Sequence, residues 1–300
     1  MSHQNNMKKI KYVLLIISLS FMVISVVSFH KMFPEIGVPY LRISWREPSS
    51  PSENGSPYKH YYYELTNVEK YGYNQVLDKI YDMPEKIKVC ALSEEELNNV
   101  FFALLSDNPD LFFVGRKCRV TRELWCDFFT IEYIMDSAEY EESRKKLDSQ
   151  VNFIVHTLTD KNDARLTEKE VHDYIIQNCS YKLEKDAHIY SSAYGCLVNG
   201  KAGCEGYSKG AKMVLDKVGI ESALITGMAK SSPKKAGAHM WNAVNLNGEW
   251  YNVDLTWDDP VSTDRRNANR YTYFNVSNKT LGADHFDFSM TFPCNKDDNK

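Results

Sequence analysis

Residues 203–210 read GCEGYSKG, and this stretch decides how the rest of the chain is interpreted. It follows a turn-rich segment at 199–203, and apolar residues recur after it at helical spacing until Gly219, a helix stop signal. The pattern predicts a helix that begins at or near Cys204. Aligned peptide dipoles at a helix N-terminus stabilise an anion, so this position favours the reactive thiolate form of a cysteine.

A hairpin is predicted after this helix. Residues 238–246 alternate as a strand, Asn247-Gly248 is a hairpin turn signal, and residues 249–254 return as the partner strand. A further short strand is expected at 223–227. This part of the chain therefore predicts antiparallel strands that follow the helix.

The hairpin turn brings His239 and Asp254 close together. Centring the hairpin on its two turn residues puts His239 opposite Thr256, which is two residues beyond Asp254. The two side chains are then diagonal neighbours on one face of the sheet. Asp254 can accept a proton from one imidazole nitrogen and fix the tautomer, while the other nitrogen reaches Cys204.

Each of these three residues has an ordinary alternative role. A lone buried cysteine usually acts as a small hydrophobe, a strand histidine is usually a satisfied polar residue, and an aspartate at a strand end usually caps a turn. The combination favours a catalytic triad over three separate ordinary roles. We expect Cys204 to be the nucleophile, His239 the base and Asp254 the acid that orients the base.

Residues 190–260 resemble the transglutaminase-like cysteine protein superfamily. The matching segments are 203–207, 215–219, Gly227, 239–242, 250–254 and 256–260. The resemblance implies an α+β fold with a papain-like or transglutaminase-like core. In that core the catalytic cysteine lies at a helix N-terminus packed on an antiparallel sheet, after a helical and β-hairpin accessory region. Gly203 stands where the family usually has a hydrophobic residue, and we expect this departure to be tolerated.

The oxyanion hole is less well defined by the sequence. The backbone N–H of Cys204 is one expected donor, because it points out of the helix start. Tyr194, Asn199 and Trp241 are the candidates for the second donor. Trp241 and Trp257 have an alternative role as walls of the cleft that exclude water. No spacing of cysteine and histidine resembles a zinc site, so we expect no metal and no cofactor.

The N-terminus predicts a membrane segment. Residues 12–29 carry no charge and follow Lys8, Lys9 and Lys11. As a helix this segment would reach roughly 27 Å, just enough to span a bilayer. The lysines favour an uncleaved, single-pass signal anchor with its N-terminus in the cytoplasm and the rest of the chain outside. A cleaved signal peptide, which would leave the protein secreted, is the alternative.

The chain divides into four predicted regions. Residues 1–30 are the signal anchor or signal peptide, and 31–57 are a linker rich in Pro and Ser. Residues 58–160 form an accessory α/β region, and 161–300 form the transglutaminase-like catalytic domain. Expected elements of the accessory region and the segment after it are a helix at 62–81, a capping box at 93–96, a hairpin at 111–118 and 124–135, and helices at 137–158 and 167–178.

The sequence also makes a prediction about one helix start and about one pair of cysteines. The helix at 167–178 is expected to open with a capping box at Thr167 and Glu170. In the hairpin, Cys118 and Cys126 face each other if the turn centres on Arg122. A disulfide between them and two half-buried thiols both remain open at this stage.

Composition and motifs together narrow the function. The chain of 300 residues has a formal net charge of only −4, which gives no reason to expect a nucleic-acid partner. We expect a bacterial cell-surface thiol hydrolase, a peptidase or deamidase, whose substrates are proteins or peptides, including ones associated with the cell wall. A protein-crosslinking transglutaminase and a non-catalytic binding module are the alternatives, because the family contains all of these.

Overall fold

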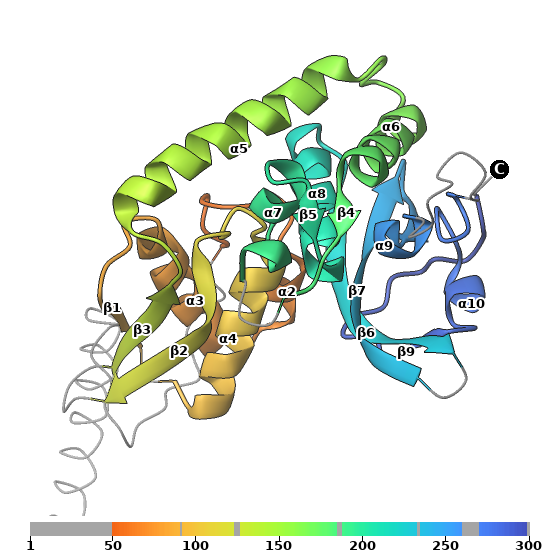
Figure 1. Cartoon of the computed structure of the whole chain (residues 1–300). Coiled ribbons are helices and arrows are strands. Elements are labelled where there is room, and N and C mark those ends of the chain that lie inside the picture. The colour runs from red at the N-terminus through yellow and green to blue at the C-terminus, as the bar shows by residue number, and fades with distance from the viewer. Residues whose placement is uncertain are drawn as a thin grey trace, which may run out of the picture. The chain divides into compact units, whose positions relative to one another are not determined.

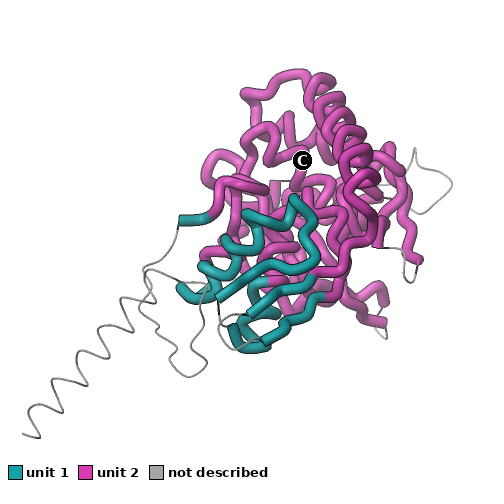
Figure 2. The backbone as a smooth tube through the Cα atoms, turned by 90° about the vertical axis from the view of Figure 1, so that its left-hand side faces the viewer, with its two compact units in different colours: residues 1–51, 65–100, 118–130 teal, residues 52–64, 101–117, 131–300 magenta. Residues whose placement is uncertain are grey.

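The computed structural model describes residues 50–90, 92–122, 127–184, 188–232, 235–259 and 270–298, and this part of the chain is a mixed α+β fold with antiparallel sheets (Figure 1). The chain separates into two compact units (Figure 2). The first unit comprises residues 1–51, 65–100 and 118–130, and the second comprises 52–64, 101–117 and 131–300.

The first unit is built around a small sheet. Its strands are ordered β1-β3-β2, and β1 and β3 are antiparallel, with Ile87 paired to Phe129. Helix α3 packs against β1, and the absence of a side chain at Gly72 leaves room for Leu92. The elements are α3 (Asn67–Ile80), β1 (Ile87–Val89), the start of α4 (Glu94–Asp107), the end of β2 (Val114–Arg122) and the start of β3 (Asp127–Tyr133).

Capping explains where the helices of this part begin. The helix expected at 62–81 is interrupted, because Thr66 and Glu69 form a capping box that starts α3 afresh after α2 (His60–Glu64). The capping box expected at 93–96 is confirmed: Ser93 N–H donates to Glu96 Oε2 at 2.7 Å, and Glu96 N–H donates to Ser93 Oγ at 3.2 Å.

The second unit contains a four-stranded antiparallel sheet ordered β8-β7-β6-β9. Helix α8 packs against β7 and β6, and helices α5, α6 and α7 pack on α8 (Figure 1). The bounds are α5 (Ser137–Thr157), α6 (Ala164–Asn178), β4 (Ser180–Tyr181), η1 (His188–Ser191), α7 (Ala193–Leu197), β5 (Lys201–Ala202), α8 (Cys204–Lys217), β6 (Ser222–Ser232), β7 (Lys235–Leu246), β8 (Glu249–Val253), α9 (Leu255–Asp258), α10 (Asn278–Leu281) and β9 (His285–Phe286).

The predicted register of the β7–β8 hairpin is confirmed. Asn242 pairs with Val253 and Leu246 pairs with Glu249, as centring the hairpin on the turn requires. The turn residues Asn247 and Gly248 have φ angles of 57° and 90°. Positive φ at both central residues is the requirement of the tight hairpin turn that matches the twist of the strands.

Small residues and one buried amide hold α8 in place. A side chain at Gly210 would lie 2.9 Å from the Cys196 sulfur, so a larger residue would displace that sulfur or push α7 and α8 apart. On the other side of α8, Asn242 Nδ2 donates to the carbonyl oxygen of Ser208 at 3.1 Å. This bond fixes the helix of Cys204 on the strand that carries His239.

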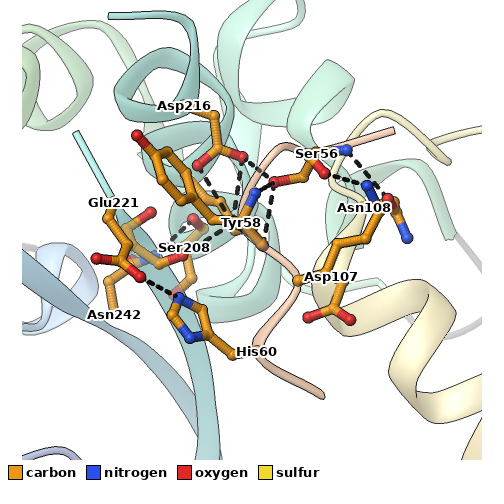
Figure 3. A network of polar contacts seen from close by, with 12 residues as sticks. Ser56, Tyr58, His60, Asp107, Asn108, Ser208, Asp216, Glu221 and Asn242 are labelled. Carbon is orange, nitrogen blue, oxygen red and sulfur yellow. Dashed lines mark hydrogen bonds and ion pairs between the residues drawn. The ribbon is translucent and has the colours of Figure 1, made fainter. Parts of the chain in front are cut away.

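The segment at 52–64 belongs to the second unit and is anchored to α8 (Figure 3). Ser56 Oγ donates to Asp216 Oδ2 at 2.6 Å, and Ser56 N–H donates to Asn108 Oδ1 at 3.1 Å. Lys212, also on α8, donates to the carbonyl oxygen of Tyr58 at 3.2 Å. Ser56, which lies in the stretch expected to be linker, is therefore buried and bonded.

Helix α6 begins earlier than the sequence suggested. The expected start at Thr167 is wrong, because the Asp163 side chain accepts from the backbone N–H groups of Arg165 and Leu166 and caps the helix one turn sooner. Thr167 is instead buried inside the helix, and its hydroxyl donates to the carbonyl oxygen of Asp160.

Two expectations fall outside the described residues. The membrane segment at 12–29 is one, and among the residues that are described no helix is long and apolar enough to cross a bilayer. The pairing of Cys118 with Cys126 is the other, because residues 123–126 are not described.

Candidate active site

Cys204 is the first residue of α8 and is half-buried. Its position confirms the predicted helix start, with extended backbone at Gly203 as the N-cap. A side chain at Gly203 would lie 2.5 Å from Leu183 Cδ2. Leu183 is exposed, so a larger residue at position 203 would require this side chain to move.

His239 and Asp254 are in direct contact, as the register predicted. His239 lies on β7, and its Nε2 is 2.6 Å from Asp254 Oδ2. Asp254 follows β8 and caps the short helix α9: its other oxygen, Oδ1, accepts from the backbone N–H groups of Thr256 at 3.0 Å and Trp257 at 3.2 Å. Because the cap fixes Oδ1, the carboxylate presents Oδ2 to the imidazole in one orientation.

The electrostatics favour an imidazolium beside the thiol. Burial acts against a charged His239, but the Asp254 carboxylate and the Cys204 thiol outweigh it and raise the pKa of His239 to about 10. Burial also acts against an ionised Asp254, yet His239 and other donors hold the pKa of this carboxyl below its ordinary value. Since Asp254 uses Nε2, the nitrogen left for Cys204 is Nδ1. Such an arrangement can support a thiolate nucleophile.

A second histidine, not anticipated from the sequence, reaches the same carboxylate. His285 lies on β9, and its Nε2 is 3.1 Å from Asp254 Oδ2. It is buried, and its Nδ1 is 2.6 Å from Asp284 Oδ1. The only sequence signal was the Asp284-His285 pair itself, far along the chain from Asp254.

The cluster of His239, Asp254 and His285 also brings three potential metal ligands together. One ligand atom from each residue lies within 4.8 Å of the others. However, both imidazoles face the same oxygen, and the second oxygen of Asp254 is used by the α9 cap. Proton-mediated hydrogen bonds account for this geometry without a cation.

The candidates for the second oxyanion donor lie in different surroundings. Trp241 is fully buried and its indole N–H donates to Asn252 Oδ1 at 3.4 Å, so that donor is already used. Tyr194 stacks on Phe112 with ring centroids 5.4 Å apart, and Asn199 is exposed in the turn before β5. The contacts of the described residues place neither of the latter two beside Cys204.

Trp241 and Trp257 lie where the alternative role, as walls of the cleft, would place them. The rings of Trp241 and Trp257 lie 6.2 Å and 5.6 Å from the imidazole of His239. Trp257 also lies 4.6 Å from the ring of His285. Tryptophan rings therefore pack beside the polar cluster, as the role of cleft walls requires.

The site thus combines a thiol at the start of α8 with a buried His–Asp contact on the adjacent sheet. The family model of the transglutaminase-like superfamily matches residues 151–255, and this part of the chain is a transglutaminase-like domain. Members of this superfamily are often cysteine-dependent enzymes. No curated protein matches the chain.

Solved structures similar to this chain match only part of it. A crystal structure of a TGase has 11% identity and a TM-score of 0.35, covering 59% of this chain and 51% of that one. A proposed cysteine protease from Cytophaga hutchinsonii has 11% identity and a TM-score of 0.30, covering 44% and 51%. A proposed protease from Parabacteroides distasonis has 13% identity and a TM-score of 0.28, covering 48% and 33%. The chain thus spans about half the length of the first two.

Proposed function

We propose that this protein is a thiol enzyme that attacks amide carbonyl groups of proteins or peptides, with Cys204 as nucleophile, His239 as base and Asp254 as orienting acid. We further propose that the reaction is hydrolytic, as in a peptidase or deamidase. The observation that carries the proposal is the 2.6 Å contact between His239 Nε2 and Asp254 Oδ2. His239 lies on β7, and a hydrogen bond from Asn242 joins this strand to α8, the helix that begins with Cys204.

The reaction proceeds in two steps. The Cys204 thiolate attacks the carbonyl carbon, the C–N bond breaks, and the amine leaves with the proton of the His239 imidazolium. The product is a thioester on Cys204. In the second step His239 takes a proton from water, the hydroxide adds to the thioester carbonyl, and the thiolate leaves as the carboxylic acid is released.

The backbone N–H of Cys204 is the proposed first donor to the oxyanion of both steps. It belongs to the group of N–H donors at a helix start that have no partner inside the helix. A donor at this point stabilises the charge that develops on the carbonyl oxygen. The second donor is left unassigned, because Trp241 already donates to Asn252.

We also propose that the enzyme acts outside the cytoplasm, held at the membrane by residues 12–29. This part of the proposal rests on the uncharged sequence of that segment and the lysines before it. Its substrates would then be proteins or peptides at the cell surface, including those associated with the cell wall.

An activated ester tests the reaction. Incubation with p-nitrophenyl acetate should give a burst of p-nitrophenol and a chain that carries one acetyl group on Cys204, mapped by mass spectrometry. The Cys204→Ala variant should show no burst. Absence of an acetyl group on Cys204 in the folded parent would reject the enzyme and favour the binding module.

Competition with an amine separates hydrolysis from cross-linking. If water resolves the acyl-enzyme, adding a primary amine such as cadaverine should leave acetate as the main product. Transfer of most acetyl groups to the amine would instead identify a transglutaminase, since the first step is common to both reactions.

A further inference from the structure

Oxygen Oδ2 of Asp254 is shared by two imidazoles. His239 Nε2 lies 2.6 Å from it and His285 Nε2 lies 3.1 Å from it. The other oxygen accepts from the backbone N–H groups of Thr256 and Trp257. The carboxylate is fully buried, and its four contacts leave it little freedom to rotate.

His285 is held firmly where it meets Asp254. Its strand β9 pairs with β6, with His285 opposite Ala229. Its Nδ1 lies 2.6 Å from Asp284 Oδ1, and the hydroxyl of Tyr273 donates to the other oxygen of Asp284 at 2.7 Å. A polar chain therefore runs from Tyr273 through Asp284 and His285 to Asp254.

The chemistry of Asp254 decides which partner donates. An ionised carboxylate can only accept, so the nitrogens of both histidines that face Oδ2 must carry protons. For His239 this places the proton on Nε2 and directs Nδ1 to the thiol, which is the productive arrangement. The side chain of His285 is entirely buried.

We propose that His285 is a positioning residue for the triad: its Nε2–H holds Asp254 ionised and correctly turned, and so keeps His239 oriented toward Cys204. The proposal rests on the proposed function of Cys204. In this proposal His285 acts on the thiol only through Asp254 and His239.

The charges around Asp254 agree with this assignment. Burial acts to raise the pKa of Asp254, and His239 first and then His285 lower it by charge and hydrogen bonding. The titratable groups that face His285 are Asp254, Asp284, His239 and Tyr273. Loss of the His285 donor should therefore make Asp254 accept a proton at higher pH.

His172 provides a matched control. It is also buried, and its Nε2 lies 3.2 Å from Oδ2 of Asp258, while its Nδ1 lies 3.2 Å from Asp173. Asp258 is the last residue of α9, the helix that Asp254 caps. Replacing His172 removes the same kind of buried histidine–carboxylate contact without touching Asp254.

Two substitutions of His285 separate its two nitrogens. The amide of Gln reaches about as far as Nε2, so His285→Gln keeps a donor to Asp254. The shorter amide of Asn reaches about as far as Nδ1, so His285→Asn keeps a partner for Asp284 and loses the donor to Asp254. Both keep a polar group at the site, which limits the effect on folding.

The experiment is the pH profile of Cys204 alkylation by iodoacetamide, mapped by mass spectrometry on the full chain. The alkylation rate falls at low pH, on the acidic limb of the profile, where the Cys204 thiolate paired with the His239 imidazolium becomes protonated. We expect His285→Asn to move this limb up by about one pH unit, which is about a tenfold lower rate at pH 5. His285→Gln should stay within about threefold of the parent, and His172→Gln should keep the parent profile.

The outcomes distinguish this inference from the proposed function. If the parent Cys204 reacts only as an ordinary thiol, with a pKa near 8.5, the proposed function is rejected and the positioning role with it. If the parent shows a thiolate at low pH and folded His285→Asn shows the same profile, the positioning role alone is rejected. An equal shift in His172→Gln would also reject it, because the effect would then be structural. A shifted limb in folded His285→Gln, which keeps the donor to Asp254, would also reject the role, and this arm stands even if His285→Asn does not fold.

Discussion

At the scale of single residues, Asp254 does two different things with its two oxygens. Oδ1 caps α9, and Oδ2 accepts from His239 and His285. Sequence reasoning offered these as alternatives, a turn cap or a triad acid, and the structure shows the cap and the histidine contact together. Whether that contact serves catalysis remains a prediction.

Asp254→Asn should separate the two uses of this side chain. If the amide oxygen keeps the cap, the amide nitrogen faces His239 and donates, which forces Nε2 to accept and moves the proton to Nδ1. The wrong tautomer should lower the acylation rate by p-nitrophenyl acetate roughly 1,000-fold or more. Circular dichroism should show a folded protein.

Asp258→Asn is the control for that experiment. Asp258 lies on the same helix but contacts His172 and the backbone N–H of Tyr273. It should retain most of the acylation activity. Parent-like acylation by Asp254→Asn would remove Asp254 from the mechanism, and since Asp258 is already bound to His172, it would not be a ready substitute.

The contact between His239 and Asp254 could be predicted from the sequence, whereas the one with His285 could not. The first follows from the local hairpin register, which an Asn-Gly turn fixes within a few residues. The second depends on β9, a strand of two residues that joins β6 from much later in the chain. A strand this short has no periodicity to detect.

At the scale of elements, a helix start was hard to place where the sequence offered two capping residues. At the start of α4, Ser93 and Glu96 were the capping residues expected from the sequence, and the structure contains their capping box. For α6, both Asp163 and Thr167 were suitable caps, and the earlier one lengthened the helix. Thr167 is accommodated inside the helix because its hydroxyl donates to the carbonyl oxygen of Asp160.

A buried acid on α6 gives a prediction about stability. Glu168 Oε2 accepts from Asn275 Nδ2 at 2.8 Å, but burial outweighs this bond and raises the pKa of Glu168 to about 7. Because the folded pKa exceeds the ordinary value of 4.5, this group's stabilising contribution is complete below about pH 4.5 and is lost as the pH rises through about 7.

Glu168→Gln should remove that dependence. The free energy of unfolding of the variant, relative to the parent, should rise between about pH 5 and pH 8, by on the order of 3 kcal/mol at most. Urea unfolding at several pH values measures it. A difference between parent and variant that stays constant over this range would show that Glu168 is ionised throughout.

At the scale of the whole molecule, the catalytic proposal and the membrane proposal are independent. The site lies entirely in the second unit, and the apolar segment lies at 12–29. The second unit begins with described residues at Ser52, and Ser56 contributes bonds to Asp216 and Asn108. A soluble form should therefore begin at Ser52, because a start at Tyr58 would remove these bonds.

Cell fractionation tests the membrane proposal. The full chain should remain in the membrane fraction, and a chain that begins at Ser52 should be soluble and still label at Cys204. Protease added to intact cells should digest the folded part and leave a short N-terminal fragment in the membrane. A mature chain in the medium that begins just after residue 28 or 29 would instead establish a cleaved signal peptide.

The hairpin turn at Asn247-Gly248 has a consequence for how such a protein can change over evolutionary time. Neither residue carries any of the proposed chemistry, yet together they set which face of the sheet every later residue of β8 occupies. One inserted residue at the turn would send the strand's side chains to the opposite face. The length of this loop is thus constrained by the register that brings Asp254 to His239, although neither turn residue takes part in the proposed reaction.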